Sequence, residues 1–280
     1  FAQNAEINKI VINFDMLIKG SKSKIYIKGR SEDSIPLIFI HGFSGTSNSW
    51  NTIREGINKR SYAIDIPGHG KSMFNDMKSD YTLNDFVFEF FLLLNHLNID
   101  KINLCGYSMG GRLCLEFANK YPHKINSLIL ESTSQGIENI EQRSDRLESD
   151  IELSNEIENN YSNFIKNWEK NSLFKKQKDR NLDEWMTQRE IRANHDNFQL
   201  AKSLNAFSLG RMNYYGDILH SFNFSVILIS GNEDEKYLKI GHKAMRLNNN
   251  VKHFIVDESS HNTHLENPDI FINIINSLEL

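Results

Sequence analysis

The sequence predicts an α/β fold, with a mostly parallel central sheet, helices on both faces and a helical cap inserted before the late strands. Three observations lead to this prediction. Short apolar runs, typical of strands buried on both faces, recur along the chain. Segments with apolar residues at helical spacing separate them, which favours parallel strands joined by helices. Between about residues 134 and 215 this alternation stops, and the chain becomes charged and helical.

The first predicted elements are two antiparallel strands within residues 9–30. Apolar and polar residues alternate there, for example at Ile10, Ile12 and Phe14, and Gly20-Ser21 marks the turn. Continuous apolar runs predict the core strands that follow. These are residues 36–40, 61–65, 101–105, 127–130, 225–230 and 253–256.

Helices are predicted at residues 83–97 and 111–120, and a closing helix is expected to start at Pro268, with Asn267 as its cap. Four more are predicted in the charged segment, at residues 138–160, 162–169, 183–193 and 198–207. Such an insert is best placed over the carboxyl edge of the sheet, where open α/β sheets bind ligands. We therefore assign residues 1–133 and 216–280 to a core domain and residues 134–215 to a helical cap subdomain.

The overall composition excludes several classes of function. A formal net charge of -4 over 280 residues gives no global positive field to attract nucleic acid. The longest apolar helical run, residues 86–97, is interrupted by Glu89 and Asn95 and is too short to span a membrane. We therefore expect no nucleic-acid partner and no membrane span.

The amino terminus and the cysteines bear on the compartment. Residues 1–6 have neither the basic region nor the apolar core of a signal peptide, and the chain lacks an initial Met. Cys105 and Cys114 fall on a predicted strand and a predicted helix, at positions where small apolar residues are expected. We interpret both as buried, reduced thiols and expect a cytoplasmic protein.

The motif Gly106-Tyr107-Ser108-Met109-Gly110 carries the chemistry. It follows a predicted strand and opens a predicted helix, which is the context of the nucleophile elbow in the α/β-hydrolase fold. Glycines are needed there because the sharp turn strains the serine and brings neighbouring backbone close. The sequence therefore predicts an α/β-hydrolase fold with Ser108 as its working serine.

A serine of this kind needs a base and an acid, which follow it along the chain in the order acid, then His. Asp234 lies just after the strand at 225–230, and His261 lies just after the strand at 253–256. We predict these two as the partners of Ser108. Alternatives remain for both roles, namely Glu233 or Glu235 as the acid and His264 as the base.

Backbone groups complete the predicted site. The N–H groups of Phe43, at the end of a core strand, and of Met109, just after the serine, would form an oxyanion hole. We interpret His41 and His69 as structural residues that brace nearby loops. No set of residues with metal-ligand spacing occurs in the sequence, so we expect neither a metal nor another cofactor.

Arg112 distinguishes this site from that of an ordinary esterase, which usually needs an apolar acyl pocket. It lies four positions after Ser108, on the serine's side of the elbow helix and about one turn further along. A guanidinium there, added to the positive end of the helix, would bind a carboxylate beside the serine. The alternative is an arginine that reaches a carboxylate at the protein surface.

These residues resemble the 2-succinyl-6-hydroxy-2,4-cyclohexadiene-1-carboxylate synthases, the MenH family of α/β-hydrolases, over nearly the whole chain. Widely shared pieces are residues 41–45, 65–72 and 264–268. Two features are more specific to this family. One is the elbow motif with its continuation Gly111-Arg112, and the other is a set of segments in and after the cap. These segments are residues 131–137, 141–150, 167–169, 173–178, 188–194 and 231–236. One departure is visible, because Gln135 stands where the family usually has proline.

The resemblance implies a lyase. In the implied reaction, pyruvate leaves a substrate with three carboxylates, 2-succinyl-5-enolpyruvyl-6-hydroxy-3-cyclohexene-1-carboxylate, after the serine removes a ring proton. The family's arginines match Arg112, Arg146 and Arg192, which would bind the carboxylates. Tyr107 and Trp168 match its wall residues, although Trp168 also suits simple packing within the cap.

Two alternatives remain at this point. One is a serine hydrolase of the same fold that cleaves esters or the carbon–carbon bonds of vinylogous diketones. The other is a ligand receptor that keeps the fold without catalysis, which the presence of all three triad residue types disfavours.

Overall fold

The structure is a computed structural model that describes residues 12–31, 34–174, 176–216, 218–247 and 250–280. Nine strands of this described chain form one sheet. They are β1 (Ile12–Lys19), β2 (Ser23–Ser31), β3 (Leu37–Ile40), β4 (Ser61–Ile64), β5 (Met73–Phe74), β6 (Ile102–Tyr107), β7 (Ile125–Glu131), β8 (Ser225–Gly231) and β9 (Val251–Val256). Their order is β1-β2-β4-β3-β6-β7-β8-β9, with β5 paired to β2.

The sheet is parallel from β4 to β9 and antiparallel at its amino-terminal edge. Residues 23–30 form an antiparallel strand as predicted, and Gly20 lies in the turn, where its N–H donates to the Ser23 carbonyl at 2.8 Å. The start of the first predicted strand, including Ile10, and the segment 1–6 lie outside the described residues.

Six helices of the described chain pack on the sheet or close the chain. They are α1 (Asn51–Gly56), α2 (Leu83–His96), α3 (Met109–Lys120), α9 (Glu235–Leu247), α10 (Thr263–Glu266) and α11 (Pro268–Ser277). Short 3-10 helices occur at Ser47–Trp50, Pro122–Lys124, Ser172–Phe174 and Ile218–His220.

Alternate residues of the buried strands face opposite layers. In β3, Ile38 joins the core that α2 and α3 cover, whereas Phe39 joins the core that α1 and α11 cover. This is why the strands are apolar without alternation, as expected for a sheet covered on both sides. The predicted α/β class, with helices on both faces, is confirmed.

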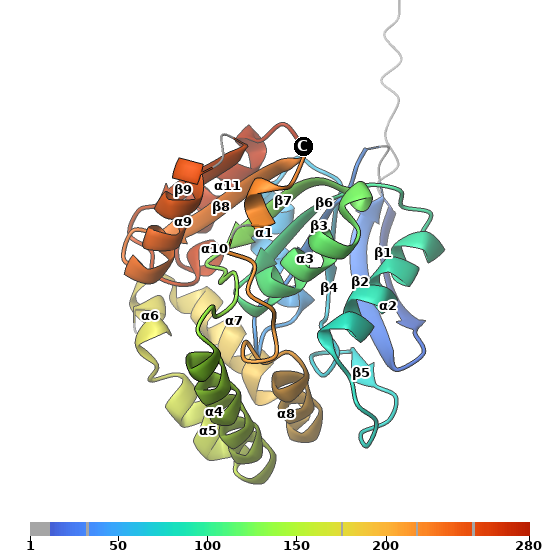
Figure 1. Ribbon diagram of the computed structural model, residues 1–280, viewed down its shortest axis with the longest axis vertical. Helices are drawn as coiled ribbons and strands as arrows, with labels where there is room; N and C mark the ends of the chain where they lie inside the picture. Colours follow the sequence, from blue (N-terminus) through green and yellow to red (C-terminus); the bar gives the residue numbers. More distant parts are fainter. Residues whose placement is uncertain (1–11, 32–33, 175, 217, 248–249) are drawn as a thin grey trace, which may run out of the picture.

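Residues 134–215, which we call the cap segment, contain helices but no strand in their described part. The helices are α4 (Ile140–Asn159), α5 (Tyr161–Trp168), α6 (Gln177–Arg180), α7 (Leu182–Ala193) and α8 (Asn197–Ala206). They gather at one end of the sheet (Figure 1). A small apolar cluster, including Ile157, Phe164 and Leu200, joins α4, α5 and α8. The division into two domains stays a prediction.

Some expectations on local structure are corrected. The elbow helix starts at Met109, two residues earlier than the predicted start, because it begins directly after Ser108. Helices α1, α6 and α9 were not predicted as separate elements; α1 and α6 have only 6 and 4 residues. Cys105 and Cys114 are buried and free, as predicted. No helix in the described ranges combines the length and apolar character needed to cross a membrane.

Candidate active site

The elbow lies at the junction of β6 and α3. Ser108 has φ 52° and ψ -107°, a strained conformation for a residue with a side chain. Its N–H donates to the Glu131 carbonyl of the neighbouring strand at 2.9 Å. A Cβ on Gly110 would lie 2.3 Å from the carbonyl oxygens of Ile40 and His41, so only glycine fits there. Tight packing between α3 and β3 thus holds the serine at the edge of the sheet.

Ser108, His261 and Asp234 come together in a chain of hydrogen bonds. His261 Nε2 lies 3.2 Å from Ser108 Oγ, and His261 Nδ1 lies 2.8 Å from Asp234 Oδ2. His261 and Asp234 are both buried. Asp234 follows β8 and His261 follows β9, so neighbouring parallel strands carry them to the same edge. Their catalytic roles stay predictions, and this geometry is what a Ser-His-Asp relay requires.

The alternative acids are engaged elsewhere. Glu233 forms ion pairs with Lys176 at 2.8 Å and Arg180 at 2.6 Å. Hydrogen bonds from Lys176 and Arg180 lower the pKa of the Glu233 carboxyl. Glu235, the first residue of α9, has an exposed side chain 3.6 Å from Lys239. The geometry therefore favours Asp234 as the partner of His261.

The alternative base, His264, belongs to a separate buried cluster. Its Nδ1 lies 2.6 Å from Glu131 Oε2, and its backbone N–H donates to Glu131 Oε1 at 3.0 Å. Its ring stacks on Trp50 with a centroid distance of 4.0 Å. Because His264 bonds to Glu131 and His261 bonds to Ser108, the geometry favours His261 as the base.

Two histidines support the loop that carries Phe43. His41 Nε2 accepts from the Ile66 N–H at 2.9 Å, and His69 Nε2 accepts from the Ser44 N–H at 3.1 Å. Desolvation by burial lowers the pKa of His41 to about 4 and that of His69 well below its ordinary value. Both rings are therefore neutral acceptors, which agrees with the structural interpretation.

A third histidine, His195, comes from the connection between α7 and α8 and was not singled out in the sequence. Its Nδ1 accepts from the Gly70 N–H at 3.4 Å, so its Nε2 donates to the Ser44 carbonyl at 3.0 Å. Burial lowers the pKa of this ring as well. The cap segment thus contacts the Phe43 loop directly.

Phe43 and Met109 lie at the same edge of the sheet. Phe43 follows β3 and Met109 follows β6, and these strands pair in parallel with Ile40 opposite Gly106. Met109 is the first residue of α3, and the first N–H groups of a helix have no acceptor within it. Both residues thus lie at the edge that carries the serine, and their roles as oxyanion-hole donors stay predictions.

Arg112 and Arg146 lie in one cationic group. Arg112 is buried, and its Nη1 donates to the Phe207 carbonyl at 2.8 Å, so it does not reach a surface carboxylate. Burial, with the nearby charge of Arg146, lowers the pKa of Arg112 to about 10. Arg146 is more exposed and pairs with Asp150 at 2.9 Å.

Lys236, which we did not predict as a site residue, adds a third cation to this group. It lies two residues after Asp234 and lines an open cavity together with Arg146. Burial and the charge of Arg146 lower the pKa of the Lys236 ammonium. The neighbouring Tyr237 packs against the His261 ring, with centroids 5.0 Å apart. Lys236 and Tyr237 follow Asp234 closely in the sequence, and this position could have identified both as site residues.

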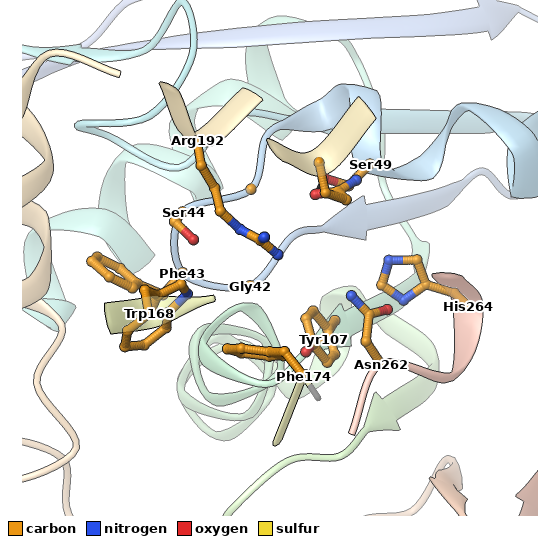
Figure 2. A pocket seen from close by; sticks show the side chains of 12 residues that line it. Gly42, Phe43, Ser44, Ser49, Tyr107, Trp168, Phe174, Arg192, Asn262 and His264 are labelled. Carbon is orange, nitrogen blue, oxygen red and sulfur yellow. Dashed lines mark hydrogen bonds between the residues drawn. The ribbon is translucent and has the colours of Figure 1, made fainter. Parts of the chain in front are cut away.

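Arg192 lies apart from this group and lines a second pocket. It extends from α7, is buried, and its Nη1 has no hydrogen-bond partner in the described residues. Figure 2 shows its guanidinium pointing into the pocket, with Tyr107 and Phe174 on the facing wall. Trp168 also lines this pocket and packs edge-on against Phe43, with centroids 5.3 Å apart. Trp168 therefore packs on Phe43 of the core and on Phe164 of the cap segment, and it also forms pocket wall.

Comparison with known proteins identifies the family. The model of the alpha/beta hydrolase fold family matches residues 35–268. A Bacillus subtilis (strain 168) protein, named provisionally as a 2-succinyl-6-hydroxy-2,4-cyclohexadiene-1-carboxylate synthase, is 30% identical over 85% of this chain and 88% of its own. The synthase of that name from Escherichia coli O1:K1 / APEC is 26% identical over 83% of this chain and 88% of its own.

A solved structure agrees with these relatives. MenH from S. aureus has a TM-score of 0.83 and 28% identity, and the match covers 91% of this chain and 97% of that one. Fold, family model and relatives therefore lead to one conclusion: the chain is an enzyme on an α/β-hydrolase scaffold and belongs to the 2-succinyl-6-hydroxy-2,4-cyclohexadiene-1-carboxylate synthase (MenH) family.

Proposed function

We propose that this enzyme is the lyase of menaquinone biosynthesis that eliminates pyruvate from 2-succinyl-5-enolpyruvyl-6-hydroxy-3-cyclohexene-1-carboxylate. The product is 2-succinyl-6-hydroxy-2,4-cyclohexadiene-1-carboxylate, the compound for which its relatives are named. The hydrogen-bonded Ser108, His261 and Asp234 support base chemistry at the serine.

One observation carries the proposal, namely that positive charge lies in two separate places around the serine, with a buried arginine in each, Arg112 and Arg192. Arg112, Arg146 and Lys236 form one group, whereas Arg192 lines a different pocket beside Tyr107. A substrate with carboxylates at several positions can engage both places at once, since arginine binds carboxylates in a bidentate manner. An apolar ester offers nothing to balance these charges.

The reaction starts with proton transfer. His261 accepts the proton of the Ser108 hydroxyl, and Asp234 holds the ring in place and stabilises the imidazolium. The serine oxygen then removes the ring proton next to the succinyl carbonyl. The electron pair moves onto the carbonyl oxygen, where the N–H groups of Phe43 and Met109 stabilise the enolate.

Collapse of the enolate completes the elimination. Its electron pair forms the ring double bond between carbons 2 and 3, and the existing double bond between carbons 3 and 4 moves to carbons 4 and 5. This shift breaks the carbon–oxygen bond between carbon 5 and the enolpyruvyl group. The leaving enolate takes up a proton, which His261 can return through Ser108, and becomes pyruvate. Tyr107 and Trp168 form walls that hold the ring against the serine. No bond between the serine and the substrate is needed.

The test is a coupled assay in which lactate dehydrogenase reports pyruvate release from the proposed substrate. Ser108→Ala, His261→Ala and Asp234→Ala should each lower kcat/KM by several orders of magnitude, because the members of a triad act as a unit. Ser149→Ala, on the exposed face of α4, is the matched control and should keep full activity. Undiminished release by the Ser108→Ala protein would rule out the mechanism.

The same experiment separates the remaining alternatives. A hydrolase would turn over members of a panel of p-nitrophenyl esters or vinylogous diketones, and would release no pyruvate from the proposed substrate. A receptor would bind the proposed substrate or its product without turnover. Either result would contradict the proposed function.

A further inference from the structure

The pocket that Arg192 lines has a polar end beyond the aromatic walls. It includes the loop Gly42–Gly45, and its polar side chains are Ser49, Gln188, Arg192, Asn262 and His264. Its enclosed interior is small, about 20 Å³, and continues into an open mouth. Figure 2 shows Ser49, Asn262 and His264 at this end, beside the guanidinium of Arg192.

Gln188 is held so that its amide group donates into the pocket. The Ser49 hydroxyl donates to Gln188 Oε1 at 3.1 Å, which identifies the oxygen side of the amide. The amide Nε2 is buried and has no partner within the described chain. Gln188 is only 4% exposed, so water does not readily satisfy this donor.

Gln188 and Arg192 act from the same face of α7, because they lie four residues apart on one helix. Arg192 is 5% exposed, and its unpartnered Nη1 is a second buried donor. The guanidinium lies 5.7 Å from the centre of the Phe174 ring, which orients it without using its N–H groups. Two donors, one of them charged, thus belong to residues that line the same pocket.

His264 provides an acceptor. Its Nδ1 lies 2.6 Å from the Glu131 carboxylate, and the tautomer that donates from Nδ1 carries a lone pair on Nε2. This Nε2 is buried and also lacks a partner among the described residues. Unsatisfied buried polar atoms are costly, and a bound group that pairs with all three of these atoms would remove that cost.

We propose that this pocket binds a carboxylate that has a hydroxyl group on the neighbouring carbon, and that Gln188 determines the specificity for it. The carboxylate accepts from Arg192 and Gln188, and the hydroxyl donates to His264 Nε2. This inference rests on the proposed function, whose substrate carries its 6-hydroxyl group next to the 1-carboxylate of the ring.

Binding of simple probes tests the pocket without any turnover. Calorimetry should show that trans-2-hydroxycyclohexane-1-carboxylate binds the wild-type protein about 10-fold more tightly than cyclohexanecarboxylate does, because only the first satisfies His264. Gln188→Leu should weaken both probes by about 10-fold, since it removes a hydrogen bond to a charged group. Gln188→Glu should weaken them further, because a carboxylate then faces the bound anion and neutralises Arg192.

Thr187→Val, next to Gln188 but exposed on the same helix, is the matched control and should bind both probes as the wild type does. Thermal unfolding shows whether each variant is folded. In pyruvate release, Gln188→Leu should raise KM by a similar factor and change kcat less, which a merely structural role would not produce.

The outcomes separate this inference from the proposed function. If the wild type prefers the hydroxy acid and Gln188→Leu weakens it, the pocket assignment stands even when no pyruvate is released, and only the proposed reaction fails. If folded Gln188→Leu binds both probes as tightly as the wild type, or if the two probes bind equally to the wild type, the assignment of this pocket is overturned.

Discussion

At the residue scale, the histidines around Ser108 show how surroundings decide the role of one residue type. His261 lies between a carboxylate and the serine hydroxyl. His264, three residues later, is bonded to Glu131 and stacked on Trp50. His41 accepts from backbone and holds a loop. The same ring is thus a candidate base, a pocket wall or a brace according to its partners.

The burial of His41 predicts a pH dependence of stability. Its pKa is about 4 in the folded protein and near 6.5 in the unfolded chain, so between these values only the unfolded chain binds the proton. Acidification from pH 6.5 toward 4 should therefore lower the free energy of unfolding, by at most about 1.4 kcal/mol per pH unit from this group.

Urea unfolding at pH 7, 6 and 5 measures this slope. His41→Gln keeps an acceptor for the Ile66 N–H and has no titrating ring, so its slope should be smaller than that of the wild type. Equal slopes in the two proteins would show that His41 does not exclude a proton in the folded state. His69 and His195 remain in both proteins and act in the same direction.

Sequence reasoning found the residues that chain order defines. Ser108, Asp234 and His261 each follow a recognisable strand, and the structure places them within hydrogen-bond distance. It did not single out Gln188 or Lys236. An amide four residues before an arginine is common on helices, and only the burial of Gln188 and the missing partner of its Nε2 distinguish it. Lys236 follows the acid closely, but its proximity to Arg146 appears only in the folded chain.

At the element scale, the elbow depends on close contact between α3 and β3. Helices usually gain stability from Gly→Ala, by about 1 kcal/mol. At Gly110 the added Cβ would meet two backbone carbonyl oxygens at 2.3 Å, and backbone cannot rotate away as a side chain can. The local preference of the helix and its packing therefore oppose each other at this position.

Gly110→Ala should accordingly destabilise the protein by about 1–3 kcal/mol, the usual cost of overpacking. It should also lower kcat for pyruvate release, because α3 would shift and move Ser108 relative to the Phe43 loop. Chemical denaturation and the coupled assay measure the two effects. Lys120→Ala, at the exposed end of the same helix, is the control and should change stability by no more than about 0.5 kcal/mol. A Gly110→Ala protein as stable as the wild type would refute the packing argument.

Most long elements were predictable and the shortest were not, although the 13-residue helix α9 was also missed. Strands buried on both faces leave a continuous apolar run, and helices such as α4 and α7 are long enough to show their period. By contrast, α6 has 4 residues, too few for a pattern. Its Arg180 nonetheless reaches across to the core, where it contacts Glu266 and Glu233.

At the scale of the whole molecule, the cap segment carries Arg146 and Arg192, whereas the core carries the serine. Polar contacts between the two parts therefore set the geometry of the site. Arg180 provides a charged link, and its partner Glu266 is buried and also accepts from the Ser260 N–H at 2.8 Å. Thr52 with Glu184 and Ser49 with Gln188 form further links.

Arg180→Ala should lower the free energy of unfolding by about 1–3 kcal/mol, because Glu266 would stay buried with hydrogen bonds from Ser260 alone. It should also lower kcat/KM, since the cap arginines would be held less firmly over the serine. Urea unfolding and the pyruvate assay test both. Lys170→Ala, an exposed cation of the cap segment, should leave both unchanged. If Arg180→Ala matches that control, the link does not hold the cap segment in place.

The sequence by itself determined the α/β class, the order of the long elements, the elbow and the triad candidates, because apolar period and chain order are local properties that a motif records. Only the tertiary structure decided that Asp234 rather than Glu233 faces His261, that His264 belongs to Glu131, and that the cations divide between two pockets. These features depend on which side chains from distant segments come into contact and on which of them are buried away from water. No single segment of the sequence contains this information.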